Sequence, residues 1–382
     1  DKGSVAPGSE SLSPATGESK GSTATPAAGY KFKNWTVDGE EVSTSATITK
    51  DAIDKVAKAS GAYVETTFTA NFEPDEKQTA AVTYTAQTGG SVTNEGDTIQ
   101  IVTANGLEGS EAKAAAGYRF AGWYKGETQI TEAEVLSKET AKANLNTDAD
   151  TGRYADTTFV AKFEPNPEAT VLVSYVSEDE TKGTVTNGDG DEIQIVTGET
   201  LEGSTAAAKA GYEFTGWYKG NDLVTSDESL SPAVAKAALD RDENNNYAAT
   251  TFTAKFAIDE DETVPVSYVS EDEAKGTVTN GDGDTIQIVT GETLEGSTAT
   301  AKAGYSFVGW YNGETKVGNN ATLTPEDALA GLNTDENGNY AATTFTAKFT
   351  ENSNVTLYYI TEDADKGSVA PGSESLSPAT GE

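Results

Sequence analysis

The chain has no cysteine, no histidine and no methionine in 382 residues. Without cysteine or histidine there is no Ser-His-Asp or Cys-His arrangement, no zinc site and no imidazole base. Disulfides are excluded as well, so each folded part must be held by its own core. A glycosidase-like carboxylate pair stays open, but 62 Asp and Glu residues make such pairs inevitable and nothing singles one out. We therefore expect no enzyme, and no catalytic or cofactor-binding residues.

Positive charge is also scarce. Lys and Arg number 26 against 62 Asp and Glu, which gives a formal net charge of -36. Such a surface repels phosphate backbones and anionic headgroups, so we expect no nucleic-acid partner and no membrane insertion. No apolar run approaches the roughly 20 residues of a membrane span, and no signal-peptide pattern opens the chain. Neither absence bears on localisation.

What the chain does contain is repetition. The segment DKGSVAPGSESLSPATGE occurs at residues 1–18 and again, letter for letter, at residues 365–382. Between the two copies, a Gly-[Ser/Thr]-Val turn recurs at Gly3, Gly90, Gly183, Gly276 and Gly367. This spacing predicts a tandem array of small modules. We expect module 1 at residues 1–74, module 2 at 80–165, module 3 at 169–256, module 4 at 262–349, and the start of a next module (the tail) at 354–382.

A motif G-Y-x-F-x-[GN]-W holds all four tryptophans, at residues 29–35, 117–123, 211–217 and 304–310. Aromatic and polar residues alternate in it, which predicts a strand with one buried face. The glycine before three of the four tryptophans indicates a bulge. We expect the tryptophans to pack in the core; a carbohydrate-stacking platform is the alternative.

Other motifs complete each module. Ser231 and Thr324 stand directly before a proline, and Thr49 and Ser137 take the same place, which predicts four capped short helices. Each module is expected to end with a strand of the pattern T-T-F-x-A-x-F. Modules 2 to 4 are expected to begin with a leading strand, which lies near Val82 in module 2. Asn-Gly pairs at 187–188 and 280–281 predict hairpin turns between early strands. The expected fold is α+β, each module being a mixed sheet with one short helix packed on it.

The order of the motifs resembles the divergent InlB-type B-repeat family, which includes the Listeria-Bacteroides repeats. The motifs that carry the resemblance are, in order, G-T-V, G-[ST]-T-A-x-A, G-Y-x-F-x-G-W and T-F-x-A-x-F. The resemblance covers nearly the whole chain, four times over. It implies small β-grasp-like modules on large extracellular surface proteins of bacteria, such as Gram-positive adhesins, where the repeats act as stalks or weakly adhesive modules. The chain departs from the shortest family members in its capped helix and in an acidic loop before the last strand.

The acidic loop is a candidate calcium site. Oxygen-bearing side chains alternate there in modules 3 and 4, at Asp240, Asp242, Asn244, Asn333, Asp335 and Asn337. Calcium favours carboxylate and amide oxygens, but an EF-hand loop needs a Glu at its twelfth position, where Thr251 and Thr344 stand. Asn, Asp and Gly are also ordinary turn residues, so a solvated turn is the alternative. A separate possibility is that an intramolecular isopeptide bond from a buried lysine stabilises each module. Lys255 lies on the outward phase of its strand, which does not favour such a bond.

The hypothesis that these observations favour is a cell-surface stalk that holds a distal head away from the cell wall. Short acidic or proline-containing linkers follow each final strand and are expected to restrict bending between modules. The partners expected are the neighbouring modules of the array. The alternatives are a multivalent array that binds a host glycan or matrix protein weakly, and a self-assembling filament subunit.

Module 1 has no leading strand of its own, because the next such sequence appears only at residues 355–360. We therefore expect module 1 to expose an unpaired sheet edge. End-to-end completion of one chain by another is the alternative to completion within a longer array.

Overall fold

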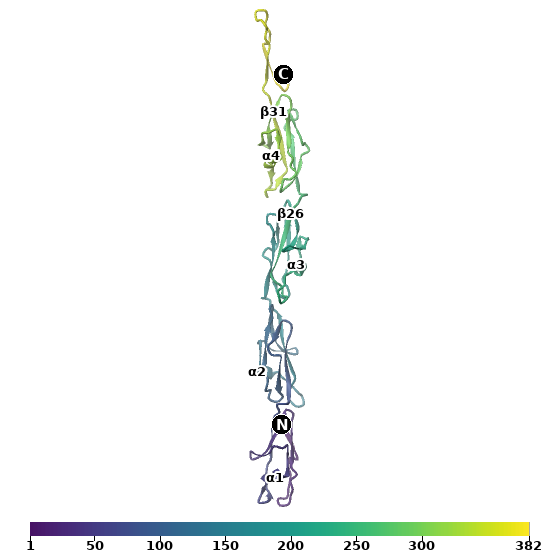
Figure 1. The fold of residues 1–382 in the computed structure, drawn as a ribbon, viewed down its shortest axis with the longest axis vertical. Helices are drawn as coiled ribbons and strands as arrows, with labels where there is room; N and C mark the ends of the chain where they lie inside the picture. The colour runs from purple at the N-terminus through teal and green to yellow at the C-terminus, as the bar shows by residue number, and fades with distance from the viewer. Residues whose placement is uncertain (382) are drawn as a thin grey trace. The chain divides into compact units, whose positions relative to one another are not determined.

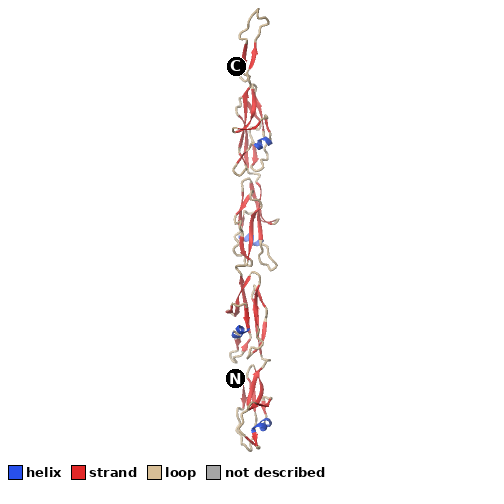
Figure 2. Ribbon diagram, turned by 90° about the vertical axis from the view of Figure 1, so that its left-hand side faces the viewer, coloured by secondary structure: helices blue, strands red, loops and turns tan. Residues whose placement is uncertain are grey.

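The computed structural model describes residues 1–381, and Glu382 lies outside the described residues. The chain divides into two compact units. The first holds residues 1–171, 193–199 and 241–248, and the second holds the intervening segments and the rest of the chain. The division passes through module 3. Its segments 193–199 and 241–248 belong to the first unit, and its other residues from 172 onward belong to the second. In both units, strands dominate and each repeat carries one short helix (Figures 1 and 2).

Module 1, in the first unit, consists of β1 (Gly3–Ala6), β2 (Ser22–Pro26), β3 (Tyr30–Val37), β4 (Glu40–Ser43), β5 (Thr47–Ile48), α1 (Lys50–Ala57), β6 (Lys58–Ala59), β7 (Ala62–Tyr63) and β8 (Thr69–Pro74). They form two three-stranded sheets, β1-β2-β5 and β4-β3-β8, and the pair β6-β7.

Module 2 follows with β9 (Thr79–Ala86), β10 (Gly90–Val92), β11 (Gly96–Gln100), β12 (Gly109–Ala114), β13 (Tyr118–Lys125), β14 (Thr128–Thr131), β15 (Val135–Ser137), α2 (Lys138–Ala143), β16 (Asn146–Thr147), β17 (Tyr154–Ala155) and β18 (Thr157–Pro165). Its main sheet has five strands in the order β11-β9-β18-β13-β14, and a second sheet has the order β10-β12-β15.

Module 3 consists of β19 (Thr170–Ser177), β20 (Gly183–Val185), β21 (Asp191–Gln194), β22 (Ser204–Ala208), β23 (Tyr212–Lys219), β24 (Asp222–Thr225), β25 (Ser229–Leu230), α3 (Pro232–Ala238) and β26 (Thr250–Ile258). Its two sheets repeat the orders of module 2, as β21-β19-β26-β23-β24 and β20-β22-β25.

Module 4 and the tail belong to the second unit. The elements are β27 (Thr263–Ser270), β28 (Gly276–Val278), β29 (Asp284–Gln287), β30 (Ser297–Ala301), β31 (Tyr305–Asn312), β32 (Thr315–Gly318), β33 (Thr322–Leu323), α4 (Pro325–Ala330), β34 (Asn333–Thr334), β35 (Tyr340–Ala341), β36 (Thr343–Glu351), β37 (Val355–Tyr358) and β38 (Ser373–Leu376). Module 4 repeats both sheets, and the tail is the two-stranded sheet β37-β38.

The central strands of each main sheet are the first and the last of their module, and they run parallel. In module 4, Tyr268 of β27 lies opposite Phe345 of β36. All other neighbours in that sheet are antiparallel. The expected mixed sheet with one short helix is therefore present in modules 2 to 4.

The second, three-stranded sheet is a difference from the expected single sheet. The small Gly-Thr-Val strand pairs there with β30 rather than with the strands of the main sheet. The prediction of hairpins at the Asn-Gly pairs was therefore wrong. Asn187 and Asn280 adopt a positive φ of 51°, but each connects strands of different sheets. Their amide groups instead donate to Asp191 and Asp284 at 2.6 Å.

The predicted bulge in the tryptophan strand is confirmed. The register shifts between Phe120 and Gly122, where Gly122 has a φ of 140° that disfavours a side chain. The same shift occurs in module 1 beside Asn34, without a glycine. The bulge turns Trp123 inward, and all four tryptophans are at most 2% exposed.

Three of the four predicted helix caps form. The hydroxyl oxygens of Ser137, Ser231 and Thr324 accept from backbone N–H groups three residues on. Thr49 takes the cap position of α1 without making this bond. The predicted final strands are also confirmed, with Phe and Ala inward, as at Phe252 and Ala254.

Module 1 has the exposed edge that the sequence predicts. Among the described residues, β8 pairs only with β3, and no strand lies along its other edge. β8 is six residues long, whereas its equivalents β18, β26 and β36 are nine. The missing parallel neighbour accounts for the shortening, since residues 65–68 have no ladder to join.

Candidate functional site: cores, acidic loops and joints

The buried tryptophans form part of a repeated aromatic cluster. In modules 2 to 4, a tyrosine from the first strand meets the tryptophan edge-on at 6.1 Å between ring centroids. The same tyrosine stacks on the first phenylalanine of the final strand at about 6 Å. The tryptophan N–H groups donate to backbone carbonyls within the module, and burial of the side chains leaves no ring face for a sugar. The core-packing interpretation is confirmed, and the carbohydrate platform is wrong for these residues.

The tyrosine of each cluster also makes a buried polar contact. Its hydroxyl donates to a carboxylate at 2.6–2.7 Å; the pairs are Tyr84 with Asp97, Tyr175 with Asp191 and Tyr268 with Asp284. Burial raises the pKa of each tyrosine far above its usual range. Burial also tends to raise the pKa of Asp284, but hydrogen bonds from Tyr268, Asn280 and two backbone N–H groups outweigh it and lower that pKa. The pairs fasten the first strand of each main sheet to the second.

The calcium candidates lie in tight turns whose oxygens bind their own backbone. Asp242 accepts from the N–H groups of Asn244 and Asn246, at 2.9 and 2.8 Å. Asp335 accepts in the same way from Asn337 and Asn339, at 2.8 and 2.9 Å. Partial burial tends to raise the pKa of Asp335, but these backbone hydrogen bonds outweigh it and lower the pKa.

The remaining candidates also have protein partners. The Asp240 carboxylate accepts from Lys219 Nζ at 2.7 Å. Asn333 accepts from the Asn312 amide and donates to a backbone carbonyl. Within the described residues there is no group of three or more acidic side chains placed to hold a metal ion. Calcium binding at these loops stays a prediction.

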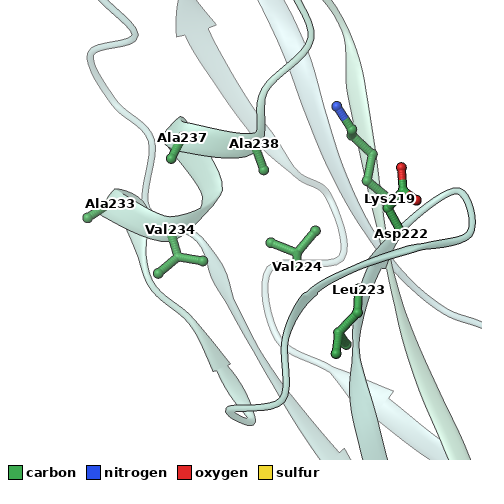
Figure 3. Close-up of a pocket in the computed structure, with 8 residues that line it drawn as sticks. All are labelled: Lys219, Asp222, Leu223, Val224, Ala233, Val234, Ala237 and Ala238. Carbon is green, nitrogen blue, oxygen red and sulfur yellow. The ribbon is translucent and has the colours of Figure 1, made fainter.

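A shallow apolar depression of about 530 Å³ lies beside α3, between the helix and β24 (Figure 3). It is lined by Lys219, Asp222, Leu223, Val224, Ala233, Val234, Ala237 and Ala238. Its two titratable groups are Lys219, which is paired with Asp240, and Asp222 on the hairpin. Its lining residues therefore include no nucleophile with a neighbouring base, as a catalytic site would require.

The most regular polar feature is a buried glutamine at each joint between modules. Gln100, Gln194 and Gln287 end the second strand of the main sheet and are 2%, 7% and 3% exposed. Each side-chain amide donates to one backbone carbonyl of the preceding module and to one of the linker that follows that module. For Gln194 these are the carbonyls of Gly117 and Asn166, at 3.1 and 3.2 Å. The contacts of Gln100 and Gln194 lie within the first unit, and those of Gln287 lie within the second.

The same glutamines also fix the loop that follows them. The Gln194 Oε1 accepts from the N–H groups of Val196 and Thr197, both at 2.7 Å. This loop then packs against the preceding module: a Cβ added to Gly117 would meet Val196 Cγ2 at 2.6 Å. A second side-chain bond crosses this joint, from the Asn246 amide to the Ala116 carbonyl at 3.4 Å.

Sequence reasoning missed these joints, although a signal was present. The sequence Ile-Gln-Ile-Val-Thr recurs at the same place in modules 2 to 4, at residues 99–103, 193–197 and 286–290. In both copies of the identical segment a serine replaces the glutamine, at Ser13 and Ser377. Ser377 Oγ accepts from the N–H groups of Ala379 and Thr380, both at 3.2 Å. The serine therefore keeps the acceptor role of the glutamine and is too short for its amide contacts.

None of the short helices in the described part of the chain has the length and apolar character needed to span a lipid bilayer. Comparison with family models gives matches over most of the sequence. The divergent InlB B-repeat domain matches residues 1–76 and 80–167, and the Listeria-Bacteroides repeat domain matches residues 172–238 and 266–329. No curated protein matches the chain. The matched segments carry the aromatic strand and the buried tryptophan of all four modules, and the chain belongs to this family of InlB-type and Listeria-Bacteroides repeats.

Proposed function

We propose that this chain is a structural spacer in the repeat region of a large bacterial surface adhesin, where it projects a distal head from the cell wall. The observation that carries the proposal is the glutamine joint. A buried side chain that bonds both to its own module and to the preceding one restricts rotation between them, as a spacer requires. Extracellular location follows from the same proposal, since repeats of this type occur in surface proteins.

The arrangement of strands within each module supports a load-bearing role. The chain enters a module by its first strand and leaves by its last, and these two are parallel neighbours, as in the five pairs from Thr157↔Val82 to Ala161↔Ala86. Pulling on the two ends then shears the ladder, so several hydrogen bonds must break together rather than one at a time. The strand order, second-first-last-third-fourth, also supports a β-grasp-like fold for each module.

No active site forms part of the proposal. The buried carboxylates face tyrosines and backbone N–H groups, and repeats of this type are typically structural modules. Binding of a host glycan or matrix protein stays a prediction. Among the described residues, Tyr124, Tyr218 and Tyr311 recur at one outward position in modules 2 to 4, each under a lysine ammonium, and Thr36 stands there in module 1.

Single-molecule stretching of the chain tests the proposal. We expect discrete unfolding events, each releasing about 300 Å less the folded length of the module, since a complete module has roughly 86 residues. High unfolding forces are expected because the parallel central strands are loaded in shear. Smooth extension at low force, with no such events, would sink the spacer proposal.

A further inference from the structure

The three glutamine joints repeat one set of contacts. Each is made by a docking loop, the sequence Ile-Gln-Ile-Val-Thr of the later module (residues 99–103, 193–197 and 286–290). The glutamine amides donate to their two carbonyls at 3.0–3.4 Å. The glutamine oxygens accept from the N–H groups two and three residues on, at 2.6–2.8 Å. The geometry is therefore conserved although the modules that meet at each joint differ.

The acceptors of the glutamine amide are groups that every residue provides. Both are backbone carbonyls, and a carbonyl oxygen accepts in the same way whatever side chain its residue carries. The second acceptor belongs to Asp75, Asn166 and Asp259 in the three joints. The bond forms with an aspartate and with an asparagine at this place, so the glutamine does not recognise the side chain.

The first acceptor is always a glycine, because the docking loop leaves no room for a side chain there. Gly29, Gly117 and Gly211 have φ values of 81–85°, which disfavour other residues. A Cβ added to any of them would meet Cγ2 of the docking-loop valine at 2.3–2.6 Å. The same glycine opens the aromatic motif of module 4, at Gly304, where φ is 85°. All four modules therefore present the same acceptor surface.

Other side-chain contacts at the joints vary without affecting the glutamine. The residue directly before the first strand is Gln78, Ala169 or Glu262. Gln78 accepts from the Gly29 N–H at 2.8 Å, and Glu262 accepts from the Gly211 N–H at 2.5 Å. The methyl group of alanine cannot accept a hydrogen bond, yet the glutamine contacts form at that joint as well. The shared part of the joint is thus independent of this extra bond.

We propose that the docking loop recognises the backbone of its partner, and that it docks on any repeat module that presents this glycine. Modules can then be removed, duplicated or reordered, and the joint forms again at each new boundary. The partner is a class, namely a repeat module whose aromatic strand begins with Gly-Tyr. A joint that relied on matched side chains would instead tie each module to one neighbour. This docking rule does not depend on what the array projects or binds.

Removal of residues 170–262, which comprise module 3 and the linker after it, tests the proposal. The first strands of modules 3 and 4 begin at equivalent residues, Thr170 and Thr263, so the shortened chain keeps the register of the repeat. Gln287 should then donate to the two carbonyls that Gln194 uses in the intact chain.

Amide hydrogen exchange at residues 287–291, followed by mass spectrometry, reads the docking loop of module 4. In the shortened chain we expect the exchange rates to stay within about twofold of those in the intact chain. Gln287→Glu keeps the oxygen and removes the donor, so it should speed exchange about tenfold in both chains. An equal effect in the two chains would show that the glutamine donates to either partner.

Two further deletions are the matched controls. Removal of residues 166–258 creates the same joint with the other linker, because β18 is then followed by Asp259. Its exchange rates should match those of the first deletion. Removal of residues 168–262 makes the linker two residues shorter, so that the loop cannot reach its partner. Exchange should then be as fast as with Gln287→Glu.

Fast exchange after removal of residues 170–262 would overturn the proposal, because docking would then require the side chains of module 3. Different rates in the two deletions that keep the register would do the same, since the linker side chain would be recognised. No effect of Gln287→Glu would remove the amide from the joint. Loss of exchange protection in β13 or β31 would also contradict the proposal, because a module would then need its own neighbour in order to fold.

Discussion

Modules 1 and 4 have closely similar motifs, but module 1 lacks the counterparts of β27 and β29, the first two strands of the main sheet. Module 4 has a five-stranded main sheet with β27 at its centre, whereas module 1 has three strands, and β8 forms an edge. The tryptophan strand, its bulge and the helix form in both. The cluster around Trp310 includes Tyr268 and Phe345, while Trp35 has Phe32 as its aromatic neighbour. The first strand is therefore not needed to shape the aromatic strand; it closes the core and extends the final strand.

The largest contrast is expected from truncating the tryptophans. Trp310→Ala should cost about 3–5 kcal/mol and unfold module 4 selectively, because it leaves a large cavity in a closed core. Trp35→Ala should cost less, since Trp35 lines an open groove with Ile53 and Phe68, where its neighbours can relax. Hydrogen exchange read by mass spectrometry, peptide by peptide, separates the modules, and the unmutated modules serve as internal controls. Equal losses would show that the first strand adds nothing to the packing of the tryptophan.

Acid should act next on module 4, through the Asp284 carboxylate. Asp284 has a lowered pKa in the folded state, so its contribution to stability is present above the unfolded value of about 3.9 and is lost as pH falls through the folded value. Each hydrogen bond to the charged form contributes about 1.5–3 kcal/mol. We expect module 4 to lose exchange protection steeply below about pH 4, and Asp284→Asn to flatten that dependence. A pH profile unchanged by the substitution would contradict the role given to this carboxylate.

The sequence predicts the parts of each module that depend on local patterns. Alternation placed Phe345 and Ala347 inward, and a hydroxyl before proline marked the start of α4 at Thr324. The second sheet was missed because Asn280-Gly281 is a common hairpin signal, and only tertiary packing shows that its strands diverge. The joints were missed because glutamine is usually a surface residue, and the carbonyls that accept from Gln287 belong to module 3 and to the linker after it.

The glutamine joints give a smaller effect that is confined to the boundary between modules. Gln287→Ser imitates the tail, where Ser377 keeps the acceptor role and lacks the amide. It should cost about 1–2 kcal/mol of coupling, since the carbonyls of Gly211 and Asp259 lose a buried donor. Faster exchange at residues 211 and 259–263, with the cores of modules 3 and 4 unchanged, is the expected readout.

Gln287→Glu is the matched variant for the joint, because it keeps the oxygen that accepts from Val289 and Thr290 and removes the donor. If the amide contacts carry the coupling, this variant should loosen the joint at least as much as Gln287→Ser. A joint that survives Gln287→Glu would assign the coupling to apolar packing of Val289 against Gly211 instead.

The smallest contrast lies at the helix caps, where the Thr324 hydroxyl makes two hydrogen bonds to Asp327 and Thr49 makes no cap bond. Thr324 Oγ accepts from the Asp327 N–H at 3.2 Å, and Thr49 makes no cap bond although it holds the same position. Thr324→Ala should therefore cost about 1 kcal/mol in module 4, while Thr49→Ala should change module 1 by only a few tenths. Both variants lose the same atoms, so exchange protection of α4 against α1 measures the cap bond together with the bond that the Thr324 hydroxyl donates to the Asp327 carboxylate at 2.9 Å. Equal losses would mean that the threonine acts through its backbone conformation, which the two positions share at ψ near 160°.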